Sequence, residues 1–431
     1  MVHECMGTNS DGNLTVGNVD TVRLAKEYGT PLYVFNENQI RNAMRSFKKS
    51  IDVCYDGNGI VCYASKAFSC KEIYRIAKEE EIGVDVVSGG ELYTALSVDF
   101  PSEKIVFHGN NKTLEELDFA IKNGVGRIVA DNFDELLRID EISAKYNKKT
   151  AVMLRLTPGI DAHTHDFVKT GMDDSKFGFT ISTGVALKAV IKTLEYKNIE
   201  FKGIHCHIGS QIFQVEPFCH TAEVMLRFMN VVREKTGKVI EELNLGGGFG
   251  IKYVDGDTPL PYQNYMQAVS TVIKDITTKM NYPIPKIFIE PGRAIVGSAG
   301  VTLYTVGSVK TIEGIRTYVA IDGGMTDNPR YALYNASYDI EIANRMNEPK
   351  DFTATVAGKC CESGDLIQED AVMQKVSAGD IMAVMSTGAY NYSMASNYNR
   401  IPKAAVVFVK DDEDRLVVKR QTYEDVASLD V

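Results

Sequence analysis

A lysine and a glutamate, each at the end of an apolar segment, are the first residues whose surroundings suggest chemistry. Lys66 stands in CYASKAF among small and apolar neighbours, and Glu290 opens EPGR directly after KIFI. A lysine shielded from water has a lowered pKa and forms Schiff bases with aldehydes, although an ordinary strand-end lysine is simply solvated. A buried glutamate needs a cationic partner to stay ionised, and a protonated pyridine nitrogen is such a partner.

A run of glycines beside EPGR indicates an anion site. GGGFG at 246–250 follows the apolar run that begins at Glu242. Successive glycines allow backbone N–H groups to approach an anion closely, and barrel enzymes place phosphate sites in the loops after strands seven and eight. A tight turn, the alternative, would need one glycine rather than three.

Two histidines in HCHIGSQ at 205–211 have several possible roles. His205 and His207 point to the same side of an extended segment, and Cys206 points to the other. A zinc site lacks a third ligand nearby in the sequence. A flat imidazole stacked on an aromatic cofactor and a histidine satisfied within the core both stay open.

Two polar segments in the last third of the chain also suggest a site. GKCCESGD at 358–365 places two thiols beside two acids, so that one cysteine could face a cleft while the other packs inside. STGAYNYSMASNYNR at 386–400 is rich in tyrosine and poor in aliphatic residues. An ordinary surface loop would hardly need three tyrosines.

The elements that must position these residues alternate between strand and helix. Eight apolar runs, each followed by a segment with helical periodicity, begin at Ile60, Val84, Ile105, Arg127, Thr150, Phe201, Glu242 and Lys286. Such alternation predicts a parallel sheet, and eight units close a (β/α)₈ TIM-like barrel. A doubly wound open sheet is the alternative. The barrel is favoured because the unusual polar residues end their strands, where barrel enzymes have their active sites.

After about residue 300, short β-type runs without long helices predict a mostly antiparallel β domain. We therefore expect an N-terminal segment (1–36) that joins the β domain, a barrel (37–297) that binds the cofactor, and a C-terminal β domain (298–431). The run Tyr33-Val34-Phe35 could instead add a strand to the barrel.

Composition narrows the class of protein. The net charge of −10 argues against a nucleic-acid partner, which would call for a basic face. The eight cysteines have no CxxC pair or regular spacing, which is typical of free thiols in a reducing compartment. There is no signal-like apolar segment at the N-terminus and no run of eighteen apolar residues, so we expect a cytoplasmic protein without a membrane partner.

Together these motifs resemble the diaminopimelate decarboxylases, a family in the alanine-racemase-like (fold-type III) group of pyridoxal-phosphate enzymes. The resemblance extends from about Thr30 to Pro402, with the motifs in the family's order. The matching segments are YASKAF, DVVSGGEL from Asp85, TGMDDSKFGF from Thr170, GIHCHIGSQ from Gly203, LGGGFG and EPGR. In one departure, the lysine motif ends in Ala67-Phe68, where the family commonly has Ala-Asn.

The resemblance implies pyridoxal 5′-phosphate as cofactor and no metal. In the family pattern Lys66 forms the Schiff base, His207 stacks on the ring, and Glu290 faces the pyridine nitrogen. The groups expected to contact the phosphate or the rest of the cofactor are Ser210, the amides of Gly247 and Gly248, the turn Glu290-Pro291-Gly292-Arg293, and Tyr390.

The resemblance also implies a substrate, meso-2,6-diaminopimelate, which would lose CO₂ at its D-configured centre to give L-lysine in the last step of lysine biosynthesis. Cys361 corresponds to the proton donor, which reaches the cofactor of the neighbouring subunit in a homodimer with shared active sites. Glu362 corresponds to the acid that binds the ammonium group at the far end of the substrate. The distal carboxylate and the substrate would be held by Arg293, Arg330, Tyr334 and Tyr390.

Rival functions make different demands on the sequence. Another decarboxylase of the group, acting on ornithine or lysine, arginine or carboxynorspermidine, would not need the arginine pair together with CCESGD. Alanine racemase would have an arginine in place of Glu290. A non-catalytic, decarboxylase-like binding protein should have lost the lysine, the phosphate glycines or the thiol, and this sequence keeps all of them.

Overall fold

A computed structural model describes residues 5–160 and 174–431, so the motif that begins at Thr170 lies partly outside the described residues. The chain forms two compact units. We call one the barrel unit (Ala43–Gly250 and Pro259–Gly292) and the other the β unit (Met1–Asn42, Ile251–Thr258 and Arg293–Val431).

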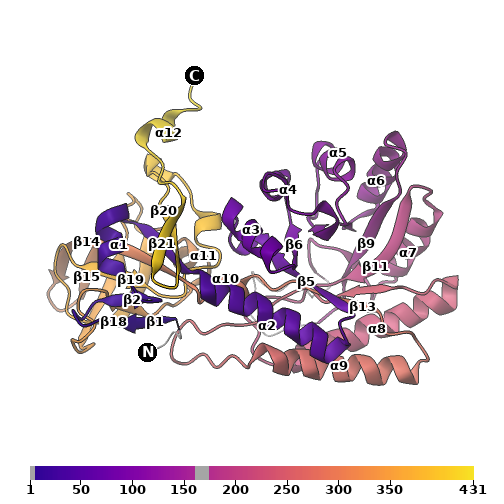
Figure 1. Ribbon diagram of the computed structural model, residues 1–431, viewed down its shortest axis with the longest axis horizontal. Coiled ribbons are helices and arrows are strands. Elements are labelled where there is room, and N and C mark those ends of the chain that lie inside the picture. The colour runs from indigo at the N-terminus through magenta and orange to yellow at the C-terminus, as the bar shows by residue number, and fades with distance from the viewer. Residues whose placement is uncertain (1–4, 161–173) are drawn as a thin grey trace. The chain divides into compact units, whose positions relative to one another are not determined.

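Eight parallel strands form the barrel (Figure 1). They are β5 (Gly59–Ala64), β6 (Gly83–Val86), β7 (Ile105–Phe107), β8 (Arg127–Ala130), β9 (Thr150–Thr157), β11 (Ile199–His205), β12 (Glu242–Asn244) and β13 (Lys286–Ile289). A short strand, β10 (Phe179–Thr180), pairs with β9 in addition. Because β13 pairs with β5 and β8 pairs with β9, the sheet closes on itself. The predicted barrel is confirmed, and the open-sheet alternative is wrong.

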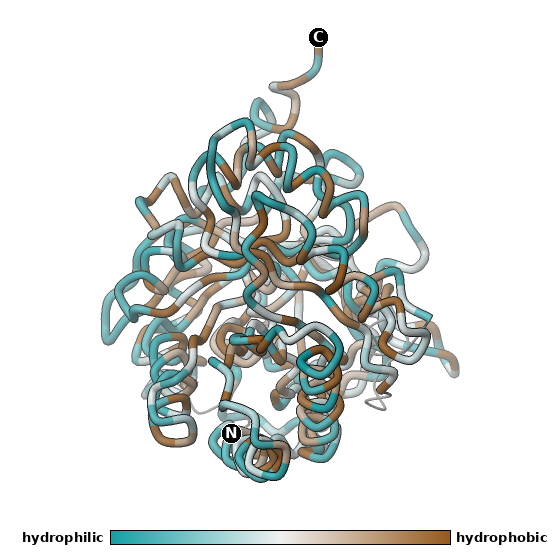
Figure 2. Tube along the Cα trace, turned by 90° about the vertical axis from the view of Figure 1, so that its right-hand side faces the viewer, coloured by the Kyte–Doolittle hydropathy of each residue, from teal (hydrophilic) through white to brown (hydrophobic). Residues whose placement is uncertain are grey.

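Helices follow the strands and cover the barrel from outside (Figure 1). They are α3 (Lys71–Glu79), α4 (Gly89–Leu96), α5 (Leu114–Lys122), α6 (Phe133–Lys145), α7 (Val185–Glu195), α8 (Glu216–Thr236) and α9 (Tyr262–Lys279), and α2 (Glu37–Tyr55) precedes β5. Side chains that accept backbone N–H groups begin several of them, as Ser88, Thr113 and Asn132 do for α4, α5 and α6. Figure 2 shows hydrophobic and hydrophilic residues alternating along the helices.

The interior of the barrel explains where its chemistry lies. Cys62, Val106, Val129, Met153 and Phe288 form one buried apolar cluster. Strand side chains alternate between faces, so the residue two positions further along each strand points to the same interior at its carboxyl end. For four of these strands that next residue is polar: His108, Asp131, Arg155 and Glu290. The apolar cluster, which we call the plug, is thus followed by a layer of polar side chains at the carboxyl ends of the strands.

The β unit is built on a mostly antiparallel sheet in the order β18-β17-β15-β14-β4-β20-β21, with β19 pairing β14 and β16. Its strands are β4 (Leu32–Asn36), β14 (Gly300–Ile312), β15 (Arg316–Ile321), β16 (Ile340–Ile342), β17 (Phe352–Ala357), β18 (Leu366–Met373), β19 (Ile381–Val384), β20 (Ala405–Lys410) and β21 (Glu413–Val418). The predicted fold class is confirmed. β4, which contains Tyr33-Val34-Phe35, pairs with β14 and β20, so this run belongs to the second sheet and not to the barrel.

Smaller elements complete the β unit. A three-stranded sheet of β1 (Met6–Thr8), β2 (Leu14–Val16) and β3 (Val19–Asp20) leads into α1 (Thr21–Tyr28), and the apolar side chains of this segment share a core with β4, β14 and β20. Short helices are α10 (Arg293–Val296), α11 (Arg330–Tyr334) and α12 (Tyr423–Ala427). Among the described residues, no helix combines the length and the hydropathy that a bilayer span requires.

Candidate active site

Lys66 lies in a single 3₁₀ turn (Ser65–Ala67) directly after β5. Its side chain is exposed, although both neighbours in the turn are buried. The Ser65 hydroxyl donates to the Asp85 carbonyl oxygen (2.5 Å), and the Tyr63 hydroxyl donates to the Phe68 carbonyl oxygen (2.8 Å). These bonds fix the turn against β6, so that the backbone presents the lysine at the carboxyl end of the barrel.

Glu290 follows β13 and is surrounded by hydrogen-bond donors. Its Oε1 accepts from His108 Nε2 (2.7 Å) and Asn244 Nδ2 (2.6 Å), and its Oε2 accepts from His205 Nε2 (3.2 Å). The sheet register places His205 directly opposite Asn244 on the adjacent strand. The Asn244 amide is oriented because its Oδ1 accepts the Gly246 N–H (2.9 Å). Since a carboxylate oxygen accepts about two hydrogen bonds, and Oε2 accepts one from the described residues, Oε2 has a lone pair open to a further donor.

The charge of this cluster resides on the carboxylate. Burial would raise the pKa of Glu290, but the adjacent imidazoles and their hydrogen bonds hold that pKa well below its usual range. Burial lowers the pKa of His205 to about 3 despite the neighbouring carboxylate, and it lowers the pKa of His108 as well. Two neutral imidazoles therefore donate to one anion, and the His205 Nδ1 is buried without a partner among the described residues.

The glycine run 246–250 packs too closely for side chains. A Cβ at Gly247 would lie 2.2 Å from the Glu290 carbonyl oxygen, and a Cβ at Gly248, where φ is +111°, would lie 2.7 Å from the Gly209 carbonyl oxygen. At Gly292 a Cβ would lie 2.9 Å from the Ala64 Cβ. The loops after β5, β11, β12 and β13 therefore meet backbone to backbone, in the arrangement that brings N–H groups close to an anion.

His207 and Ser210 lie in the loop after β11, and both are half-buried. The Gly247 N–H approaches His207 Nδ1 at 3.4 Å. Burial, followed by the charges of Lys66 and Arg155, lowers the pKa of His207 well below its usual value. The structure thus brings His207, Lys66 and the glycine run together within the barrel unit.

The predicted substrate residues gather within the β unit. The Arg293 guanidinium lies 4.8 Å from the centroid of the Tyr390 ring, and the Arg330 guanidinium lies 5.8 Å from that of Tyr334. Both arginines donate to the hydroxyl of Tyr253. Tyr390 has φ of +64°, which is strained for a residue with a side chain and is often found at functional sites.

The segment 358–365 forms a tight turn around a buried acid. Asp365 accepts the backbone N–H groups of Cys360 (2.7 Å) and Met325 (2.6 Å) through its carboxylate. Cys360 is buried, whereas Cys361 and Glu362 are exposed in the single chain. The turn therefore presents one thiol and one carboxylate outward.

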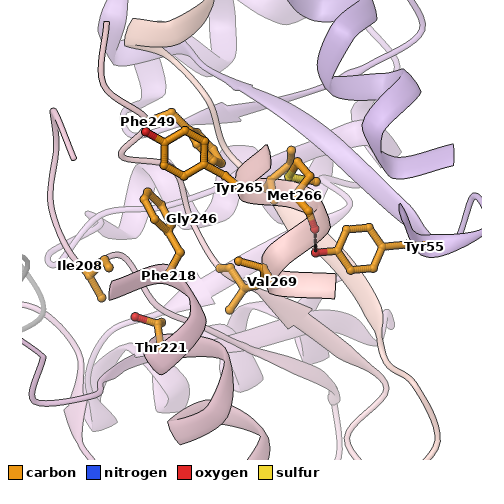
Figure 3. Close-up of a pocket in the computed structure, with 11 residues that line it drawn as sticks. Tyr55, Ile208, Phe218, Thr221, Gly246, Phe249, Tyr265, Met266 and Val269 are labelled. Atoms are coloured by element: carbon orange, nitrogen blue, oxygen red, sulfur yellow. Dashed lines mark hydrogen bonds between the residues drawn. The ribbon is translucent and has the colours of Figure 1, made fainter. Parts of the chain in front are cut away.

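An apolar cavity of about 20 Å³ is lined in part by Gly246, the first residue of the glycine run (Figure 3). A space of this size holds roughly one water molecule, and its lining is almost wholly apolar. Tyr55 donates to the Met266 carbonyl oxygen at its edge (3.4 Å). The lining residues are Tyr55, Ile208, Phe218, Thr221, Leu245, Gly246, Phe249, Tyr265, Met266, Val269 and Ile289.

Sequence reasoning missed several residues of these clusters. Asn244 and Arg155 are polar residues within otherwise apolar runs, a signal that could have singled them out. Asp85 is buried with one carboxylate oxygen lacking a partner among the described residues, and burial raises its pKa well above the usual range. Tyr253 had no signal, because a tyrosine shortly after a glycine run is unremarkable.

Comparisons with known proteins agree with this geometry. Residues 37–297 match the family model described as pyridoxal-dependent decarboxylase, pyridoxal binding domain. Diaminopimelate decarboxylase of Bacillus subtilis (strain 168) is 48% identical over 430 residues, which cover 100% of this chain and 98% of that protein. The Staphylococcus aureus (strain COL) enzyme of the same name is 46% identical over 418 residues, or 96% of each chain.

A solved structure extends the likeness to three dimensions. Diaminopimelate decarboxylase from M. jannaschii in complex with L-lysine superposes with a TM-score of 0.92 at 33% identity, covering 100% of this chain and 98% of that one. This chain belongs to the diaminopimelate decarboxylase family, within the pyridoxal-dependent decarboxylases. It is a decarboxylase with pyridoxal 5′-phosphate as its cofactor, as the sequence predicted.

Proposed function

We propose that this chain removes CO₂ from the D-configured centre of meso-2,6-diaminopimelate and so produces L-lysine. The observation that carries the proposal is Arg330, a buried guanidinium whose hydrogen-bond partners are the hydroxyls of Tyr253 and Tyr338. A buried cation of this kind favours a bidentate carboxylate ligand. Diaminopimelate has a carboxylate at its far end, whereas ornithine and lysine have only an amine there.

The residues of the barrel unit fit the cofactor. Glu290 is a buried, ionised carboxylate with one open lone pair, which is what a pyridinium N–H requires as acceptor. The glycine run admits an anion to its backbone N–H groups. When bound, pyridoxal phosphate supplies an electron-poor ring that accepts the negative charge left as the carbon–carboxylate bond breaks.

We assign the cofactor contacts accordingly. When the cofactor is bound, Lys66 would hold its aldehyde carbon through Nζ, His207 would pack on the ring, and Glu290 would keep the ring nitrogen protonated. The phosphate and the remaining contacts fall to Ser210, Gly247, Gly248, Pro291, Gly292, Arg293 and Tyr390. The expected consequence is a covalent adduct that borohydride makes permanent. Lys66→Ala should lose both adduct and turnover, and an adduct retained by that variant would mean that another lysine serves.

The residues of the β unit complete the reaction. Arg293, Arg330 and Tyr334, with Tyr390, hold the distal carboxylate, and Glu362 accepts from the distal ammonium. Cys361 donates its thiol proton to the carbon that has lost CO₂. Because the turn around Asp365 exposes both Cys361 and Glu362, these side chains are available to a second chain. We therefore propose a homodimer, in the cytoplasm, in which each subunit lends this turn to the other's site.

Subunit mixing tests the shared site. Lys66→Ala disables one site, and Cys361→Ala disables another through the opposite chain. Mixing the two inactive variants under conditions that permit exchange should restore about a quarter of wild-type sites if exchange is statistical, by the symmetry of a two-fold interface. No recovery despite demonstrated exchange would place both residues in the same chain's site.

A side-by-side assay tests the reaction itself. Enzyme loaded with pyridoxal phosphate is given diaminopimelate, ornithine, lysine or arginine, and CO₂ release is measured. Diaminopimelate should be the substrate with the highest kcat/KM by a wide margin. Equal or faster turnover of ornithine or lysine would favour the rival decarboxylases, and no turnover of any of them by the loaded protein would favour a binding protein.

A further inference from the structure

Tyr253 stands at the centre of the arginine pair. Its hydroxyl oxygen accepts from Arg293 Nη1 and from Arg330 Nη1, the latter at 2.9 Å. The two guanidinium groups also lie 5.6 Å and 5.3 Å from the centroid of its ring. All three side chains are at most 8% exposed. A single oxygen therefore receives two cationic donors away from water.

The charge of this cluster is not balanced by an acid at Arg330. Among residues 5–160 and 174–431, the Arg330 guanidinium meets the hydroxyls of Tyr253 and Tyr338 and no carboxylate, and its Nε is buried without a hydrogen-bond partner. A buried cation without a counter-charge is strongly destabilising. The groups that meet Arg330 are phenols, and a phenol can supply a negative charge only by losing its proton.

Tyr253 and Tyr338 differ in whether the proton of the hydroxyl group has a hydrogen-bond acceptor. The Tyr338 hydroxyl has two acceptors for its proton, Asn328 Oδ1 (3.3 Å) and Asn391 Oδ1 (3.4 Å). The Tyr253 hydroxyl has no acceptor among the described residues, while both of its lone pairs face donors. Hydrogen bonding thus favours a neutral phenol at Tyr338 and a phenolate at Tyr253.

We propose that the Tyr253 phenolate replaces the distal carboxylate of the substrate as the anion beside the two arginines in the empty site. When the carboxylate binds, Tyr253 takes up one proton and becomes a neutral phenol. The proton comes from bulk solvent, and the only bond that forms is the O–H bond of the phenol. The inference rests on the proposed function, because it assigns the distal carboxylate to Arg293 and Arg330. It makes Tyr253 a positioning residue that determines specificity.

The electrostatics of the cluster support this assignment. Burial would raise the pKa of the Tyr253 hydroxyl, but Arg293 and Arg330 outweigh burial and lower that pKa below its usual value. For Tyr338, burial prevails and raises the pKa. The phenols of Tyr334 and Tyr390 lie against the two arginines, at Arg330 and Arg293 respectively. On the element that carries Tyr253, the carboxylate of Asp257 accepts the backbone N–H of Tyr253 (2.9 Å), and Lys252 pairs with Asp255 (3.1 Å).

The consequence is a proton linked to binding of a carboxylate. L-lysine, the product, keeps the distal carboxylate, whereas cadaverine lacks it. Above the pKa of Tyr253, binding of L-lysine should take up a proton, so its affinity should fall as pH rises, by at most about tenfold per pH unit for one proton. Binding of cadaverine should take up none at this group.

Calorimetry on the loaded enzyme measures that proton. Wild type, Tyr253→Phe and the matched control Tyr338→Phe are titrated with L-lysine and with cadaverine, in buffers of different ionisation enthalpy, at several pH values below the usual tyrosine pKa of about 10. Wild type and Tyr338→Phe should take up a proton with L-lysine, and Tyr253→Phe should not. Tyrosinate absorbance in the wild type should fall when L-lysine is added and should be absent from Tyr253→Phe.

The outcomes separate the two proposals. Equal proton uptake and equal pH dependence in wild type and Tyr253→Phe would overturn the role of Tyr253 while leaving the proposed function intact. A wild-type enzyme that neither binds L-lysine nor decarboxylates diaminopimelate would instead overturn the proposed function. If Tyr253→Phe does not fold, the wild-type titration alone decides, because tyrosinate absorbance that L-lysine does not change contradicts the inference.

Discussion

The two units of this chain each bury a charged cluster, and the buried charges of the two clusters have opposite signs. In the barrel unit the charge is an anion, Glu290, surrounded by neutral donors from His108, His205 and Asn244. In the β unit the charges are cations, Arg293 and Arg330, that meet in one phenol, Tyr253. Among the residues that the structure describes, neither Glu290 nor Arg330 has a permanently charged side chain of opposite sign within hydrogen-bond reach.

The difference shows how a buried charge is kept ready for a ligand. A lysine or arginine against Glu290 would compete with a protonated ring nitrogen, and an aspartate against Arg330 would compete with a substrate carboxylate. Neutral donors at Glu290, and at Arg330 a phenol that can lose and regain its proton, allow the ligand to take over the interaction when it binds. The strongest interactions of each cluster are therefore made only when the ligand is bound.

Removal of the anion should have the largest effect. Glu290→Gln is expected to lower turnover by about 10²-fold or more, as for other losses of a preorganised charge in a dry site, while the cofactor stays bound. Steady-state kinetics and the visible absorbance of the cofactor measure the two quantities separately. Near-normal turnover would show that the reaction does not need this carboxylate to keep the ring nitrogen protonated.

Removal of one cation should have the next largest effect. Arg330→Ala is expected to lower kcat/KM for diaminopimelate, because the distal carboxylate loses its bidentate partner. The loss of transition-state stabilisation should be roughly 2–5 kcal/mol. Arg316, which pairs with Glu369 (2.6 Å) elsewhere in the β unit, supplies the matched control, and Arg316→Ala should leave kcat/KM within about twofold of wild type. Unchanged kinetics for Arg330→Ala would favour the ornithine or lysine alternative.

Removal of a neutral donor should have a smaller effect with a distinct signature. His108→Leu takes one hydrogen bond from Glu290, worth about 1.5–3 kcal/mol for a charged acceptor. The pKa of Glu290 is held low by its donors, so the carboxylate is present above that pKa and is lost as pH falls through it. In the variant the pKa rises, and the acid limb of the kcat profile should move to higher pH. The exposed His220 on α8 is the control, and His220→Leu should not move that limb.

A change in the apolar cavity should have the smallest effect and should leave activity alone. Val269→Ile adds one methylene group beside the cavity of about 20 Å³. Filling it should stabilise the protein by at most about 1 kcal/mol. Thermal denaturation measures the change, with Val231→Ile at an exposed position of α8 for comparison. A lower melting temperature for Val269→Ile would mean that the site cannot accept the added volume.

The barrel and the contents of its rim were largely predictable from sequence, and the partners of the cationic cluster were not. Alternating apolar runs fix which residues face the barrel interior, so Glu290 and His207 could be placed at the catalytic end from local pattern alone. The donors of Glu290 are the last residues of β11 and β12 and the residue after β7, and only the sheet register brings His205 opposite Asn244. Tyr253 is harder still, because residues 251–258 leave the barrel and pack with the β unit, although nothing in their composition marks the change.

The alternation inside the barrel also separates what holds the protein together from what it does. On four strands the side chain that fills the plug and the one that reaches the polar layer are two residues apart, a distance of about 7 Å along the strand. Substitutions at Val106 or Met153 should therefore lower the stability of the fold. Substitutions at His108 or Arg155 should instead lower catalytic activity. During evolution the polar side chain at the carboxyl end of a strand can change while the apolar side chain two residues before it stays the same. New activities can then arise on this scaffold without a new core.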